Sequence, residues 1–181
     1  MNVDIREATP ADASDIADVA KQAWYEVHAP IIGEELVAEF LGRYYDTDSL
    51  RAVGESDERV TYVADHEDGV VGFVSGGPDE DERELLHLSR IYLLPEYWGE
   101  GIGSRLLDTF EQQAIEQGHS RIRLRVMVDN EQAVGFYEST GFDRRDERYD
   151  ELVKTNSYVY VKELDGRESE TVDDLGSHPF D

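Results

Sequence analysis

Apolar residues recur at helical spacing in the first part of the chain. Between residues 11 and 28 they fall on one face of a helix: Ile16, Val19, Ala20, Ala23, Trp24 and Val27. Thr9 can cap this helix and Pro10 fits its first turn, whereas Pro30 should end it. The same spacing predicts a second helix over residues 34–45, and a short strand over residues 3–6 precedes both.

Shorter apolar runs bounded by turn residues predict the strands of a sheet. They cover residues 60–64, 70–75, 85–94, 122–128, 142–148 and 157–164. Two further helices are expected over residues 101–117, where Gly118 would end the helix, and over residues 130–140. The pattern predicts one α/β domain over residues 1–164. The polar segment 165–181 lacks periodicity, which predicts an acidic C-terminal tail.

The chain is strongly acidic. Asp and Glu outnumber Lys and Arg by 42 to 17 in 181 residues, which gives a formal net charge of −25. This charge repels phosphate backbones and anionic lipids, so binding to nucleic acid or to a membrane is disfavoured. The absence of cysteine excludes disulfides and thiolate metal sites, and no spaced set of histidines predicts a metal. Since no apolar run could span a membrane and the acidic start is unlike a signal peptide, we expect a cytoplasmic protein.

The basic residues indicate how the surface charges are arranged and what salt concentration the surface suits. Arg121, Arg123 and Arg125 share one face of the strand at residues 122–128, either as a phosphate-binding patch or, as we favour, as a surface that balances acidic neighbours.

The chain has only three lysines, Lys21, Lys154 and Lys162, which together with the excess of carboxylates is typical of a halophilic, salt-adapted surface. An acidic face that attracts a polyamine or a basic peptide is less favoured, because the acids are scattered along the whole chain.

Salt is therefore expected to stabilise the fold. At molar salt the screening length falls to about 3 Å, which suppresses repulsion among the surface carboxylates. The denaturation midpoint should rise as KCl increases from dilute buffer toward molar concentration. A midpoint that stays flat or falls over this range would contradict salt adaptation.

A glycine-rich turn lies between the strand at residues 85–94 and the following helix. Gly99, Gly101 and Gly103 occupy alternate positions, where they can expose successive backbone N–H groups beside the positive end of a helix dipole. This arrangement suits a pyrophosphate, although a tight turn also needs glycine for steric reasons alone. The Walker pattern fails because Ser104 and Arg105 follow the last glycine, and the dinucleotide fingerprint fails because position 104 is not glycine.

A second motif lies about thirty residues downstream, where Asn130, Ala133, Phe136, Tyr137, Gly141 and Phe142 follow the pattern Asn-x-x-Ala-x-x-Phe-Tyr-x-x-x-Gly-Phe. Together with the glycine turn, this segment resembles the GNAT superfamily of acyl-CoA-dependent N-acyltransferases. The family's acyl-CoA signature has Gln or Arg where this chain has Trp98. The resemblance implies the GNAT fold, with a mixed and mostly antiparallel central sheet flanked by helices.

The resemblance also implies a co-substrate, acetyl-CoA, and the residues that bind it. Main-chain groups of Ile91, Tyr92 and Leu93 would pair with the pantetheine arm as with an added strand. Asn130 would contact the same arm, and Phe136 would be a core residue with one edge against it. The pyrophosphate would lie on the turn formed by Trp98, Gly99, Glu100, Gly101, Ile102, Gly103 and Ser104.

For catalysis, the resemblance makes Tyr137 the general acid at the CoA sulfur, the alternative being a tyrosine that only closes the pocket. His87 occupies the position of the family's usual base, with Glu84 as a weaker substitute; His87 could equally fill the cleft or bond to a neighbour. Tyr25, His28 and Tyr149 are candidates for the acceptor pocket, whereas Trp24 is more typical of the core.

These expectations describe an N-acetyltransferase that acts on a primary amine of an unidentified small molecule or peptide. Two alternatives stay open at this point, a non-catalytic acyl-CoA-binding regulatory module and a protein N-terminal acetyltransferase. The sequence leaves the oligomeric state open, with a homodimer as one expectation.

Overall fold

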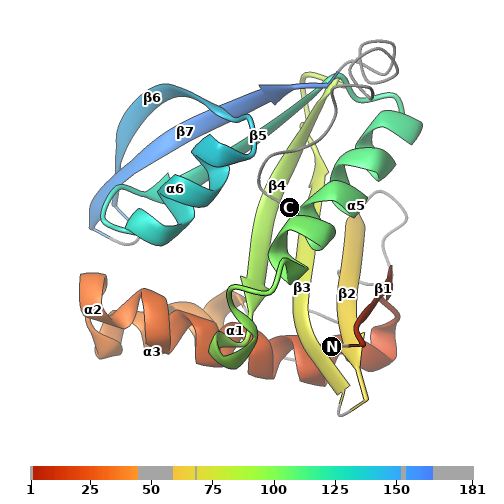
Figure 1. Cartoon of the computed structure of the whole chain (residues 1–181). Helices are drawn as coiled ribbons and strands as arrows, with labels where there is room; N and C mark the ends of the chain where they lie inside the picture. Colours follow the sequence, from red (N-terminus) through yellow and green to blue (C-terminus); the bar gives the residue numbers. More distant parts are fainter. Residues whose placement is uncertain (1, 45–58, 68, 152–153, 165–181) are drawn as a thin grey trace.

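The computed structural model describes residues 2–44, 59–67, 69–151 and 154–164. One seven-stranded sheet organises them, in the order β1-β2-β3-β4-β5-β7-β6 (Figure 1). The strands are β1 (Asp4–Glu7), β2 (Val60–His66), β3 (Gly69–Pro78), β4 (Leu85–Leu93), β5 (Arg121–Met127), β6 (Asp143–Asp150) and β7 (Thr155–Glu163). Every neighbouring pair is antiparallel except β4 and β5. The mixed, mostly antiparallel α/β fold is thus confirmed.

The helices follow the apolar periodicity closely. They are α1 (Ala13–Val27), α2 (Ala29–Ile32), α3 (Glu34–Tyr44), α5 (Ile102–Glu116) and α6 (Glu131–Ser139), with short 3₁₀ turns at Pro10–Asp12 and Pro95–Tyr97. Pro30 lies in the first turn of the short α2, where its missing N–H costs no helical bond. Among the described helices, none combines the length and apolar character needed to cross a bilayer. The predicted tail, residues 165–181, lies outside the described residues.

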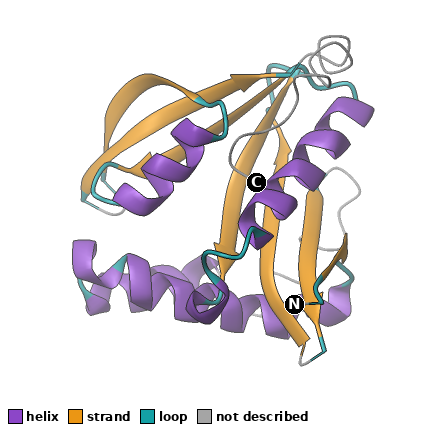
Figure 2. Ribbon diagram, in the orientation of Figure 1, coloured by secondary structure: helices purple, strands orange, loops and turns teal. Residues whose placement is uncertain are grey.

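Helices cover both faces of the sheet (Figure 2). α5 packs against β2, β3 and β4, and its buried Phe110 belongs to one core cluster with Val74 of β3. α1 packs on the opposite face, where Trp24 shares a second cluster with Phe73. Neighbouring residues of β3 therefore point into different cores, as strand geometry requires. α6 contributes Tyr137 to the first cluster.

β4 and β5 run together only at one end and then separate (Figure 1). Their pairing covers Leu85–His87 and Arg121–Arg123 and stops there. Just beyond this point the pairing of β3 with β4 is irregular. Gly76 pairs with Leu88 and Ser75 with Arg90, so Ser89 has no partner on β3. Such a bulge bends a strand. Gly76 permits the close approach, since a Cβ there would overlap the carbonyl oxygen of His87.

The three arginines of β5 have different surroundings. Arg121 pairs with Glu82 at 2.5 Å, and Arg123 lies 3.5 Å from Asp79. The predicted balance of charge with acidic neighbours is confirmed for these two. Arg125 forms no ion pair with any carboxylate in the described part of the chain.

Candidate active site

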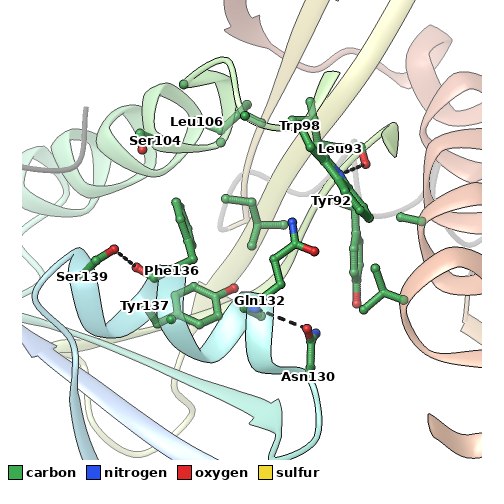
Figure 3. Close-up of a pocket in the computed structure, with 18 of the residues that line it drawn as sticks. Tyr92, Leu93, Trp98, Ser104, Leu106, Asn130, Gln132, Phe136, Tyr137 and Ser139 are labelled. Carbon is green, nitrogen blue, oxygen red and sulfur yellow. Dashed lines mark hydrogen bonds between the residues drawn. The ribbon is translucent and has the colours of Figure 1, made fainter. Parts of the chain in front are cut away.

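A cavity of about 710 Å³ opens where β4 turns away from β5, and we call it the main cavity (Figure 3). Its walls come from β4, the glycine turn, the start of α5 and α6. The predicted cofactor residues gather around it with one exception: Ile91, Tyr92, Leu93, Trp98, Gly99, Glu100, Gly101, Gly103, Ser104, Asn130 and Phe136. Ile102 is the exception, because its side chain is buried in the core beneath α5.

The N-terminus of α5 forms one wall of the main cavity. Gly101 precedes the helix with a φ of 81°, a left-handed conformation that glycine adopts without strain. The first intrahelical bond joins the Arg105 N–H to the Gly101 carbonyl, so the N–H groups of residues 102–104 have no helical partner. This helix is described throughout, and its first turn contains no acidic residue and no side-chain cap. The free donors and the helix dipole suit a phosphate group.

The open edge of β4 forms a second wall. The Leu94 N–H donates to Val71 of β3, so alternation along the strand directs the main-chain groups of Ile91 and Leu93 to the opposite side, into the cavity. The Trp98 indole Nε1–H donates to the Leu93 carbonyl at 2.9 Å and thereby closes the end of this edge. The prediction for Tyr92 needs correction, since the same alternation turns its main chain toward β3; only its side chain lines the cavity.

α6 supplies the third wall. The Asn130 side chain caps the helix by accepting a hydrogen bond from the Ala133 N–H at 3.2 Å. The family resemblance implies only a cofactor contact for Asn130, so this capping role is additional. Phe136 packs against the core and lines the cavity, as expected of a core residue with one exposed edge. Gln132 also lines the cavity, although its exposed helical position gave no signal in the sequence.

Tyr137 lies at the inner end of the main cavity (Figure 3). Its side chain is buried, with its ring against Phe136 and Phe142 at centroid distances of 5.4 and 5.6 Å. Burial raises the pKa of its phenol well above the usual value. Tyr137 therefore stays protonated and can act as a hydrogen-bond donor throughout the physiological pH range.

An adjoining cavity of about 310 Å³ meets the main cavity at Tyr137 and Tyr92, which line both. Its outer wall is aromatic: Trp24 stacks on Phe40 at 4.6 Å. Trp24 is thus both a core residue, as predicted, and a cavity residue. The strands β4 and β5 supply the remaining wall, including residues Leu88 to Tyr92 and Leu124 to Met127.

His28 is the one predicted acceptor residue that lines the adjoining cavity among the described residues. It is 5% exposed, and its ring packs edge-on against Trp24 at 4.2 Å. Its Nδ1 is buried without a hydrogen-bond partner. Burial lowers the pKa of His28 to about 4, so the imidazole is neutral at pH 7.

Because His28 is buried in its neutral form, the free energy of unfolding should depend on pH. Between pH 6.5 and about 4 the unfolded chain binds a proton at His28 that the native state excludes, so the free energy of unfolding falls as the pH is lowered. The loss approaches about 3 kcal/mol. His28→Leu should remove this component and unfold less steeply with acid than wild type, as measured by urea denaturation at pH 7 and pH 4.5. Equal pH dependence in the two proteins would contradict the buried neutral imidazole.

The structure does not bring the other predicted residues to either cavity. Tyr25 packs against the α1 core, and Tyr149 is 61% exposed on β6. His87 lies where β4 is still paired with β5, before the strands separate, and its Nε2 bonds to Asp79 at 2.6 Å. Its prediction as the base is therefore not supported by its position. Glu84 is exposed before the start of β4 and lines neither cavity.

Comparisons with known proteins agree with this architecture. Residues 22–142 match the Acetyltransferase (GNAT) family. An uncharacterized N-acetyltransferase of Mycobacterium tuberculosis is 30% identical over 157 residues, which cover 84% of this chain and 98% of that protein. A spermidine N(1)-acetyltransferase of Thermoplasma acidophilum is 26% identical over 162 residues, covering 87% of this chain and 99% of the relative.

The fold is also similar to solved structures. The crystal structure of the PaiA N-acetyltransferase of Thermoplasma acidophilum in complex with coenzyme A superposes with a TM-score of 0.80 at 24% identity, covering 91% of this chain and 100% of the other. The match over residues 22–142 includes both the glycine turn and the Asn130 to Phe142 motif. The chain belongs to the GNAT family of acetyltransferases.

Proposed function

We propose that the protein transfers an acetyl group from acetyl-CoA to a primary amine of a small molecule or peptide. The observation that carries the proposal is the junction of two cavities at the Tyr137 side chain. The main cavity would hold the acetyl donor and the adjoining cavity the amine. Family membership supports the acetyltransferase activity, and the geometry supports the division of roles.

The residues around the main cavity fit coenzyme A. The N–H groups of residues 102–104 would bind the pyrophosphate, because they have no helical partner. The main-chain groups of Ile91 and the N–H of Leu93 would pair with the pantetheine arm along the open edge of β4. Acetyl-CoA, when bound, supplies the acetyl group as an activated thioester.

Tyr137 would stabilise the departing sulfur by donating a hydrogen bond. A thiol has a reference pKa near 8.5, about 1.5 units below that of a phenol. Because burial raises the pKa of Tyr137 further, its O–H favours donating a hydrogen bond to the thiolate over losing the proton completely.

The acceptor amine must lose a proton before it can attack. At pH 7 this costs about 1.4 kcal/mol for an amine with a pKa near 8 and about 4.6 kcal/mol for one near 10.4. His87 lies outside both cavities, and His28, with its pKa lowered to about 4, is a weak base. We therefore assign proton removal to solvent, so the rate should rise with pH toward the pKa of the amine itself.

His87→Ala consequently tests the assignment of the base. It should leave the shape of the kcat/KM against pH profile unchanged, since the His87 ring bonds to Asp79 away from the cavities. A profile measured with one amine from pH 6 to 9 suffices. Loss of the acidic limb in the variant would restore His87 as the base.

The amine-transfer proposal is tested by incubating the protein with acetyl-CoA labelled in the acetyl group and a panel of amines. Label in an amine product supports it. Binding of acetyl-CoA with no transfer to any amine would favour a non-catalytic acyl-CoA-binding module. Transfer confined to the α-amines of polypeptides would instead identify a protein N-terminal acetyltransferase.

A further inference from the structure

The adjoining cavity carries positive charge, although the chain as a whole is strongly negative. Arg90 from β4 and Arg125 from β5 both line it. Asp150 is the only acidic residue among its described lining residues. The local charge of this cavity is therefore opposite to the net charge of −25.

Arg125 differs from the other arginines of its strand. Arg121 and Arg123 each pair with an acid of the segment that precedes β4. Arg125, two residues further toward the opening, has no ion pair with the described carboxylates. An arginine without a carboxylate is unexpected in a chain with 42 acidic residues. Its guanidinium is available to a ligand in the cavity.

A third guanidinium, that of Arg59, lies next to Arg90. Its Nη2 donates to the Ser75 hydroxyl at 3.3 Å, and Ser75 is the partner of Arg90 in the register of β3 with β4. Its Nε is buried without a hydrogen-bond partner. A Cβ on Gly77 would lie only 2.9 Å from Nη1, so glycine at this position makes room for the side chain. Burial and then the charge of Arg90 lower the pKa of Arg59.

Arg59, which is half-buried, and Arg90 lie close enough for their positive charges to repel, and an anion bound beside them would relieve this repulsion. The planar guanidinium binds a carboxylate through two parallel hydrogen bonds. Arg90 directly precedes Ile91, which lines both cavities. The positive charge thus lies in the same cavity that opens to Tyr137.

We propose that the acceptor carries a carboxylate as well as its amine, and that Arg90 and Arg125 bind this carboxylate while Arg59 adds charge beside Arg90. The inference rests on the proposed function, because it takes the adjoining cavity as the acceptor site. The aromatic wall of Trp24, Phe40 and Tyr92 suits an apolar or aromatic side chain. The class of acceptor is therefore an amino acid, and a polyamine is disfavoured by the arginines.

A binding experiment tests the anion site without turnover. 3-Phenylpropionate has the carboxylate without the amine, and phenethylamine has the amine without the carboxylate. With the full-length protein saturated with CoA at constant ionic strength, calorimetric titration should give at least about tenfold tighter binding of the acid. Arg125→Gln and Arg90→Gln should each weaken binding of the acid about tenfold and should not weaken binding of the amine, because each removes a positive charge that repels the ammonium group.

Arg83→Gln is the matched control, since Arg83 is exposed outside both cavities and its loss changes the net charge equally. It should leave the affinity for both probes unchanged. Equal or tighter binding of phenethylamine in wild type would overturn the proposal. So would an unchanged affinity for 3-phenylpropionate in both cavity variants.

Kinetics then separate this inference from the proposed function. Phenylalanine and lysine should have kcat/KM values at least about tenfold above those of phenethylamine and cadaverine, which lack only the carboxylate, and Arg125→Gln should bring each pair close to parity. Transfer to the simple amines at equal or higher rates would refute the carboxylate requirement while upholding acetyl transfer. Failure to acetylate any amine would refute the proposed function, and with it the acceptor assignment, even if 3-phenylpropionate still binds.

Discussion

Tyr137→Phe is expected to lower kcat by about 10²- to 10³-fold, the range typical of removing one hydrogen-bond donor to a developing anion. The substitution keeps the ring that packs against Phe136 and Phe142 and removes only the hydroxyl. CoA affinity should be retained, because the proposed phosphate and pantetheine contacts are made by α5 and β4. Steady-state kinetics with a saturating amine, together with calorimetric titration of CoA, measure both quantities.

Tyr158→Phe is a suitable control for this prediction. The substitution removes the same group, a phenol hydroxyl, but Tyr158 lies on β7 beneath the Arg144 guanidinium, outside both cavities. Its kcat should stay close to the wild-type value. If Tyr137→Phe turned over at the wild-type rate with chemistry shown to be rate-limiting, the assignment of the Tyr137 hydroxyl as the hydrogen-bond donor to the departing sulfur would be wrong.

Gly101→Val should weaken CoA binding by about tenfold or more. Gly101 has a φ of 81°, and a β-branched residue pays a cost on the order of 1–3 kcal/mol there. A Cβ at this position meets no atom within 4 Å, so the effect comes from the backbone and not from a steric clash with a neighbour. The strained turn would move the N–H groups of residues 102–104 out of line.

Gly118→Val separates loss of binding from loss of stability. Gly118 has a similar φ of 90° and equally open surroundings, but it lies beyond the opposite end of α5. Both variants should show comparable destabilisation in thermal unfolding, whereas only Gly101→Val should lose CoA affinity. Equal CoA affinity in the two variants would remove the glycine turn from the binding site.

Periodicity and local motifs were sufficient to predict most of the fold. The helical spacing around Trp24 and the alternation around Leu124 each depend on burial of one face, which neighbouring residues encode directly. The same holds for the glycine turn, because Gly101 requires a conformation that other residues resist. Local rules of this kind do not need knowledge of distant contacts.

The finer geometry depended on contacts between distant segments. His87 occupies the position of the family's base in the sequence of β4. However, β4 and β5 separate only after His87, and the pairing of β4 with β3 and β5 determines where they separate. Likewise, the alternation of Arg121, Arg123 and Arg125 predicted acidic neighbours for all three and gave no sign that Arg125 would instead line a cavity. That difference arises from the path of the acidic segment before β4, where Asp79 and Glu82 lie.

Amide hydrogen exchange with and without CoA tests the central claim most directly, namely that the opening between β4 and β5 binds the acetyl donor. The amides of Ile91, Leu93 and residues 102–104 have no main-chain partner among the described residues, so they should exchange quickly in the free protein and slow markedly with saturating CoA. Amides of β1 and β2, which lie away from the opening, should be unaffected. Saturation with CoA that leaves the amides of Ile91, Leu93 and residues 102–104 unprotected, or that protects another face of the sheet in their place, would contradict this claim.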